Sequence, residues 1–196
     1  MASSVIAPES RVSELLKETT VAPESKLVGY TEVFEANKAS KATVVVNVGG
    51  AGSSKSYSIA QLFVHKLINE SNKTFGVIRK TFPALRMTSY GLIIGLLKQY
   101  GVYREEKHNR TANNYVYKDS VVWFFSIDEI EKVKSTSFNY IWVEECSEIS
   151  WDEFIVLKTR LRAPTTKDCP NQMFLSLNPS DSFGWVAVKL CNATKS

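Results

Sequence analysis

The sequence predicts an α/β domain with a mostly parallel sheet flanked by helices. After Lys41, stretches with strand character alternate with stretches of helical periodicity, which is the pattern of strands joined by crossover helices. The apolar runs Ala42–Val48 and Phe138–Glu144 lack polar alternation, as expected of strands buried on both faces. With 196 residues, 44% of them hydrophobic, the chain is long enough to build one such domain with a full core.

The first part of the chain divides into an arm and the start of the domain. Residues 1–25 are expected to form an N-terminal arm, and residues 26–196 the domain. Leu27–Phe34 has the composition of a strand, and Ala42–Val48 is the first buried strand. A loop of small residues follows, and then apolar residues recur at helical spacing over Ser56–Ile68.

The same criteria assign the rest of the chain. Apolar β-branched and aromatic runs predict strands, and apolar residues spaced three and four apart predict helices. The expected elements, in order, are a strand at Thr74–Arg79, a helix at Leu85–Tyr100, two strands within Tyr115–Phe125 around a turn at Lys118 and Asp119, a short helical piece at Glu129–Lys134, a strand at Phe138–Glu144, a helix at Trp151–Leu161, a strand at Gln172–Leu177 and a helix at Phe183–Cys191.

Composition excludes several classes of protein. The three cysteines, Cys146, Cys169 and Cys191, are odd in number and have no paired short spacing, which argues against a disulfide framework and favours the reduced cytosol. No apolar stretch is long enough to span a membrane, and the N-terminus does not resemble a signal peptide. The net charge is −2 over residues 1–40, +8 over residues 41–110 and −2 over residues 111–196. The basic middle section indicates either a polyanionic partner or a solvated lysine-rich face.

The loop after the first buried strand fits a phosphate-binding P-loop, or Walker A motif. The pattern is glycine, four residues, and Gly-Lys-Ser/Thr between a strand and a helix. Backbone N–H groups of such a loop and the helix N-terminus bind phosphate oxygens, while the lysine neutralises charge and the last hydroxyl binds Mg²⁺. Ser54 replaces the second glycine, which we expect to be tolerated only at negative φ; the alternative is an ordinary glycine-rich turn capped by serines. The expected nucleotide-binding residues are Gly49, Gly50, Ala51, Gly52, Ser53, Ser54, Lys55 and Ser56.

Two adjacent acids end a later buried strand. Glu144 and Glu145 follow an apolar run, and ligands bind at this edge of open parallel sheets. In P-loop ATPases of the additional-strand, RecA-like type, the first acid holds Mg²⁺ and the second orients the attacking water. The alternatives are a solvated strand end or charges at the start of the next helix.

A third strand ends in Ser176, Leu177, Asn178 and Pro179, which by itself could be a common turn. Taken with the P-loop and the stretch from Trp142 to Ile149, it resembles the ATPase domain of the large terminase subunit of tailed bacteriophages. The resemblance covers roughly residues 26–190.

The resemblance implies an ATP-hydrolysing motor that moves double-stranded DNA into a procapsid. It implies ATP and Mg²⁺ as cofactors, Lys55 and Glu145 as catalytic residues, Ser56 and Glu144 as metal ligands, and Ser176 and Asn178 as the coupling motif. A transition-state arginine is expected among Arg79, Arg160 and Arg162. Tyr30 and Phe34 are weaker candidates for stacking on adenine.

The resemblance also implies partners. These are double-stranded DNA bound through its phosphates, a portal protein, a small terminase subunit and further copies in a ring, all in the host cytoplasm and transiently on the procapsid portal. A membrane is not expected. A C-terminal nuclease domain, usual in the family, is not expected here, because one acid, Asp181, follows Asn178. The residues expected to contact DNA are Lys80, Arg86, Arg104, Lys107 and Arg110.

Three other functions stay open. The chain could be another P-loop enzyme, such as a kinase, which would transfer phosphate to an acceptor. It could be a nucleotide-dependent DNA-binding or assembly module without turnover. It could be a RecA-like or helicase motor, although motifs for strand separation are not visible.

Overall fold

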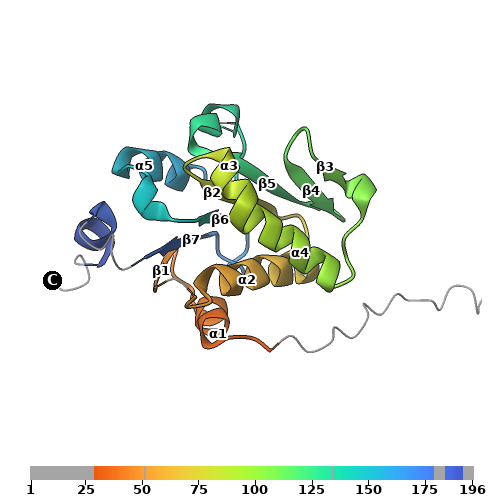
Figure 1. The fold of residues 1–196 in the computed structure, drawn as a ribbon, viewed down its shortest axis with the longest axis horizontal. Coiled ribbons are helices and arrows are strands. Elements are labelled where there is room, and N and C mark those ends of the chain that lie inside the picture. Colours follow the sequence, from red (N-terminus) through yellow and green to blue (C-terminus); the bar gives the residue numbers. More distant parts are fainter. Residues whose placement is uncertain (1–28, 51, 134, 179–183, 192–196) are drawn as a thin grey trace, which may run out of the picture.

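A mixed, mostly parallel sheet organises the chain in the computed structural model, which describes residues 29–178 and 184–191 except Ala51 and Lys134 (Figure 1). The sheet has seven strands in the order β1-β7-β6-β2-β5-β4-β3. The five strands from β1 to β5 in that order are parallel, and β4 and β3 extend the edge antiparallel. This confirms the predicted fold class.

The elements follow one another as the alternating pattern predicts. Their bounds are α1 Glu32–Ala39, β1 Val44–Val48, α2 Lys55–Asn69, β2 Thr74–Arg79, α3 Phe82–Leu85, α4 Gly91–Gln99, β3 His108–Asn109, β4 Asn114–Tyr117, β5 Ser120–Ser126, β6 Tyr140–Val143, α5 Trp151–Thr159 and β7 Gln172–Leu177. Shorter helical turns are Arg86–Tyr90, Glu105–Lys107, Ile127–Val133, Cys146–Glu148 and Ala187–Cys191.

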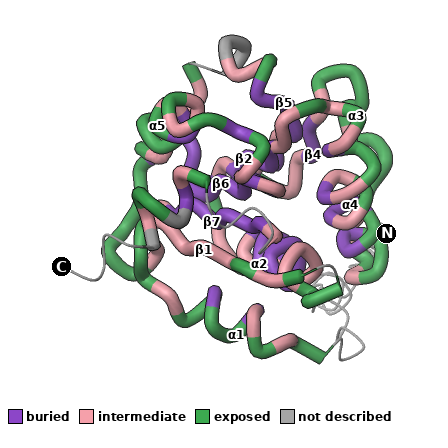
Figure 2. The backbone as a smooth tube through the Cα atoms, turned by 60° about the vertical axis from the view of Figure 1, so that its left-hand side comes forward, coloured by how far each residue is buried: buried purple, intermediate pink, exposed green. Residues whose placement is uncertain are grey.

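The central strands are buried on both faces, so the sheet separates two hydrophobic cores. On β6, Trp142 packs into the core beneath α2 and α4, whereas Ile141 packs into the core beneath α5. Figure 2 shows the buried strands enclosed by helices with exposed outer surfaces. This double burial is why β2 and β7 have apolar runs without alternation, and both strands have the bounds that the sequence predicts.

Two expectations about secondary structure are wrong. The strand expected at Leu27–Phe34 is absent from its described part, where the chain instead enters helix α1 at Glu32. Thr31 caps this helix by accepting a hydrogen bond from the Phe34 amide, and two glutamates in the first turn suit the helix dipole. The helix expected at Leu85–Tyr100 is interrupted by a kink within Arg86–Tyr90, where Thr88 has non-helical backbone dihedrals.

Two further expectations fall on residues that the structure does not describe. The N-terminal arm, residues 1–25, lies outside the described residues, as does the start of the helix expected at Phe183–Cys191. In the part of the chain that is described, no helix combines the length and apolar character needed to cross a membrane.

Candidate active site

Three of the predicted motifs meet at one edge of the sheet. The loop after β1, the acids after β6 and Asn178 after β7 all follow the carboxyl ends of parallel strands, and β7 lies between β1 and β6 (Figure 1). The pairing continues past the strand ends, where Gly49 N donates to Leu177 O at 3.2 Å and Glu144 N donates to Ile78 O at 2.8 Å. This is the edge where ligands bind in open α/β sheets.

The loop after β1 has the backbone conformation that its glycines permit. A Cβ at Gly49 would lie 2.5 Å from Ser53 Oγ, so a side chain at this position would require the Ser53 side chain to shift. Gly52 has a φ of +80°, in the left-handed region that glycine adopts readily. Ala51 lies outside the described residues.

Ser54 corrects one expectation about this loop. We expected a negative φ where serine replaces the second glycine, but Ser54 has a φ of 60° and a ψ of 3° at the N-cap of α2. Its carbonyl accepts hydrogen bonds from the amide and the hydroxyl of Ser58, both in the first turn of α2. The loop thus has the backbone geometry of a glycine at this position despite the serine. A residue with a side chain in the left-handed region costs about 1–2 kcal/mol relative to the right-handed region.

A polar chain connects the predicted catalytic residues. Lys55 Nζ donates to Asn178 Oδ1 at 2.9 Å and to Gly50 O at 3.3 Å. Asn178 in turn donates from its backbone N to Glu145 Oε1 at 3.1 Å and from Nδ2 to Glu145 Oε2 at 3.2 Å. Glu145 has a φ of 51°, so the chain turns sharply after β6 and aims its carboxylate at Asn178. The sequence placed these residues in one site but did not predict Asn178 as the link.

Glu144 is held on the other side of the site. It is buried, and its Oε2 accepts hydrogen bonds from Thr88 Oγ1 at 2.5 Å and from Ser89 N at 3.4 Å. Thr88 and Ser89 are not predicted as site residues from the sequence, because the stretch that contains them shows only the apolar spacing of a helix. No local signal marks a hydroxyl that contacts a residue more than fifty positions away.

The donors at this edge suit a hard cation. Carboxylate and hydroxyl oxygens, here from Glu144 and Ser56, are ligands that Mg²⁺ prefers. Among the described residues, no group of three His, Cys, Asp or Glu side chains could hold a metal. In nucleotide sites Mg²⁺ is commonly bound through one or two carboxylates together with phosphate oxygens and water.

Ser176 is part of the core rather than the open site. It is 1% exposed, and its hydroxyl accepts a hydrogen bond from Trp142 Nε1 at 3.1 Å. Trp142 is itself fully buried. Ser176 therefore satisfies the polar atom of a large core side chain, one strand away from the acids.

The three candidate arginines lie in different places. Arg79, at the end of β2, pairs with Glu148 through two bonds of 3.2 and 3.3 Å and donates to Thr88 Oγ1 at 3.3 Å. Burial by itself lowers the pKa of Arg79, but the hydrogen bond and charge of Glu148, with the neighbouring acids, raise it above its usual value. Arg160 and Arg162 follow α5. The carbonyl oxygen of Arg160 accepts a hydrogen bond from Phe138 N, which lies just before the start of β6. Both arginines therefore lie at the opposite end of the parallel strands from the P-loop.

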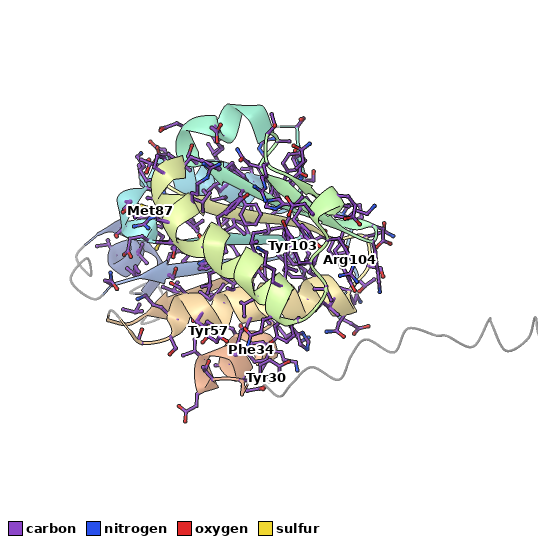
Figure 3. The ribbon with its side chains drawn as sticks, turned by 45° about the vertical axis from the view of Figure 1, so that its right-hand side comes forward. Tyr30, Phe34, Tyr57, Met87, Tyr103 and Arg104 are labelled. Carbon is purple, nitrogen blue, oxygen red and sulfur yellow. The ribbon has the colours of Figure 1, made fainter. Side chains whose placement is uncertain are left out.

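The two candidates for stacking on adenine differ in their exposure to solvent. Phe34 is fully buried and stacks on Tyr30 with ring centroids 4.0 Å apart, so its ring is not available to a base. Tyr30 is 45% exposed. Figure 3 shows both residues on α1 and its approach, below α2.

The basic residues expected to contact DNA do not form one patch. Lys80 pairs with Glu153 at 2.9 Å, and Arg110 pairs with Glu105 at 2.7 Å. Lys80 and Arg86 precede α4, whereas Arg104, Lys107 and Arg110 follow it. Figure 3 shows Met87, next to Arg86, and Arg104 at opposite ends of this helix.

Known proteins resemble this chain in sequence and in fold. A sequence model described as phage terminase large subunit matches residues 41–195. The PBSX phage terminase large subunit of Bacillus subtilis (strain 168) is 33% identical over 140 residues, which are 70% of this chain and 31% of that protein.

Solved structures show the same fold at low identity. The large terminase of a thermophilic bacteriophage, also solved with ATP-gamma-S, superposes with a TM-score of 0.66 at 16% identity, covering 85% of this chain and 44% of that one. The ATPase domain of the Thermus phage P74-26 large terminase gives a TM-score of 0.51 at 14% identity, covering 76% and 80%. The chain thus spans less than half the length of the PBSX protein and of the thermophilic phage terminase.

Proposed function

This chain belongs to the phage terminase large subunit family, and we propose that it is the motor ATPase of such a subunit. In this proposal it hydrolyses ATP with Mg²⁺ and uses the energy to move double-stranded DNA into a procapsid. The observation that carries the proposal is the hydrogen-bonded chain from Lys55 through Asn178 to Glu145 beside a P-loop.

Each step of hydrolysis has a residue at the site. The backbone amides of residues 49–56 bind the β- and γ-phosphates, and Lys55 leaves Asn178 to neutralise their charge. Glu145 accepts a hydrogen bond from the attacking water and orients it in line with the γ-phosphate. Ser56 and Glu144 would hold Mg²⁺, which would neutralise developing charge on the phosphate oxygens.

Asn178 gives this site a route for coupling. It contacts the lysine that binds the γ-phosphate and the acid that orients water, so the arrival or loss of that phosphate changes both contacts. Asn178 follows β7 directly, at the edge of the sheet that carries the site. We assign the coupling role to Asn178, with Ser176 fixing the strand behind it through Trp142.

The positions of the three candidate arginines determine how each could act as the transition-state arginine. Arg79 is near the acids, and it would have to leave Glu148 to reach a phosphate. Arg160 and Arg162 could act only on a neighbouring copy, because they lie at the far end of their own sheet. Such an arginine is worth about 10³–10⁵ in rate, so a ring of copies is expected to hydrolyse faster than a single chain.

The partners follow from the same function. Double-stranded DNA is expected to bind through its phosphates without base readout, since a packaging motor accepts any sequence. A portal protein, a small terminase subunit and a homo-oligomeric ring in the host cytoplasm complete the proposed assembly.

The test is phosphate release from ATP by the purified chain, with and without Mg²⁺ and double-stranded DNA. We expect Mg²⁺-dependent release that Lys55→Ala and Glu145→Ala both abolish. Release that needs an added acceptor would indicate a kinase instead. Tight ATP binding without release, also in the presence of DNA, would indicate a binding or assembly module.

A further inference from the structure

The helical segment between β2 and β3 is kinked beside the active site. Helix α3 ends at a kink within Arg86–Tyr90 before α4 begins, and Thr88 in this kink has a φ of −119° and a ψ of −105°, outside the helical region. The kink places the Thr88 hydroxyl and the Ser89 amide against the carboxylate of Glu144.

Thr88 contacts the acid that we assign to the metal. Its Oγ1 lies 2.5 Å from Glu144 Oε2, and Arg79 Nη1 donates to the same hydroxyl at 3.3 Å. Ser89 N donates to Glu144 Oε2 as well, at 3.4 Å. Both contacts thus reach one carboxylate oxygen, which leaves Oε1 for another ligand.

The hydroxyl of Thr88 has a choice of acceptors. It can donate its one proton to Ala84 O, at 2.9 Å, or to the carboxylate of Glu144. The carboxylate is nearer and charged, and hydrogen bonds to ionised acceptors are about twice as strong as neutral ones. A threonine that only stabilised its helix would need the carbonyl alone, as Thr159 does with Val156 O at 2.7 Å.

We propose that Thr88 is a positioning residue for metal binding, because its hydroxyl holds Glu144 Oε2 and so presents Oε1 to Mg²⁺. The inference rests on the proposed function, in which Glu144 binds that ion. In this proposal the kinked helical segment supports the metal site through Thr88 and Ser89, without supplying a metal ligand itself. Hydrogen-bond partners that orient metal ligands commonly contribute 10–100-fold to metal affinity.

The experiment compares variants that keep or remove the hydroxyl. Thr88→Val has nearly the same shape without the hydroxyl, Thr88→Ser keeps it, and Thr159→Val is the matched control on an exposed helical threonine. Mn²⁺ replaces Mg²⁺ as a probe, and its binding to each chain in the presence of ADP is titrated by electron paramagnetic resonance. Thermal unfolding of each variant, followed by circular dichroism, reports any general loss of structure.

The proposal predicts a specific pattern. Thr88→Val weakens Mn²⁺ binding about tenfold or more, Thr88→Ser stays within threefold of the native chain, and Thr159→Val is unchanged. The Mg²⁺ concentration for half-maximal phosphate release shifts in the same order. If Thr88→Val does not fold, Thr88→Ala removes the same hydroxyl and carries the same prediction.

Two results would overturn the proposal. One is a change of less than threefold on removing the hydroxyl from a folded chain. The other is a serine variant as weak as the valine variant. A native chain that binds no Mn²⁺ with ADP would instead contradict the proposed function, and the two failures are distinguished by that single titration.

Discussion

Replacing Asn178 by alanine removes the side chain that links Lys55 to Glu145. The change deletes the bond from Nδ2 to Glu145 Oε2, of 3.2 Å, and the bond from Lys55 Nζ to Oδ1, of 2.9 Å. The backbone N–H bond to Glu145 Oε1, of 3.1 Å, remains. Glu145 therefore keeps one of its two restraints from this residue and gains freedom to rotate.

The expected loss is calculated from the bond to Glu145 alone, because in the proposed function Lys55 leaves Asn178 to bind phosphate. A hydrogen bond to a charged group contributes about 1.5–3 kcal/mol. If that energy orients the water in the transition state, kcat falls by about 10- to 150-fold, at about 1.4 kcal/mol per factor of ten.

The assay is phosphate release at saturating Mg²⁺ and ATP, with ATP binding measured separately. ATP affinity should change by less than about threefold, since the P-loop is intact. Asn69→Ala, an exposed asparagine near the far end of α2, is the matched control and should leave kcat unchanged. A folded Asn178→Ala chain with kcat within twofold of the native value would refute the linking role.

Three further predictions concern stability. Ser176→Ala leaves Trp142 Nε1 buried without its acceptor, which costs about 1–3 kcal/mol and lowers Tm by about 2–12 °C in a calorimetric scan; an unchanged Tm would contradict this. Ser54→Gly should raise the free energy of unfolding in urea by up to about 1 kcal/mol and Ser54→Val should lower it, because the φ of 60° favours glycine; a valine variant as stable as the native chain would be inconsistent with that backbone. Burial, and to a smaller extent neighbouring cations, lower the pKa of His65 and His108 in the folded chain. Below about pH 6.5 the unfolded chain therefore binds more protons than the folded chain. The free energy of unfolding consequently falls as the pH drops through that value. His108→Gln should flatten the dependence of Tm on pH between about 7 and 5, and an unchanged slope would show that this histidine does not contribute.

The sequence was sufficient to predict the sheet and the meeting of its motifs. Strands buried on both faces have continuous apolar runs, and the ends of parallel strands share one edge, so Lys55, Glu144, Glu145 and Asn178 were expected together. These inferences need only local patterns and one topological rule.

Other features depend on contacts between distant segments. Thr88 contacts an acid 56 positions later, and the hydroxyl has no local signal that distinguishes it from Thr159. The strand predicted at Leu27–Phe34 was wrong because a short aromatic stretch fits strand and helix equally, and the cap at Thr31 decided the outcome. The positive φ at Ser54 was not predicted because the loop imposes a conformation that serine does not prefer.

The most direct test of the account is to separate ATP binding from hydrolysis at Glu145. Glu145→Gln keeps the size of this side chain and one acceptor oxygen for Asn178 N, but it cannot act as a base, and its NH₂ group cannot accept the bond that Asn178 Nδ2 donates to Glu145 Oε2. We predict ATP affinity within about threefold of the native chain and phosphate release slowed by about 10²–10⁴-fold. Release at the native rate by this variant would contradict the assignment of Glu145, and a native chain that binds no ATP would contradict the assignment of the site.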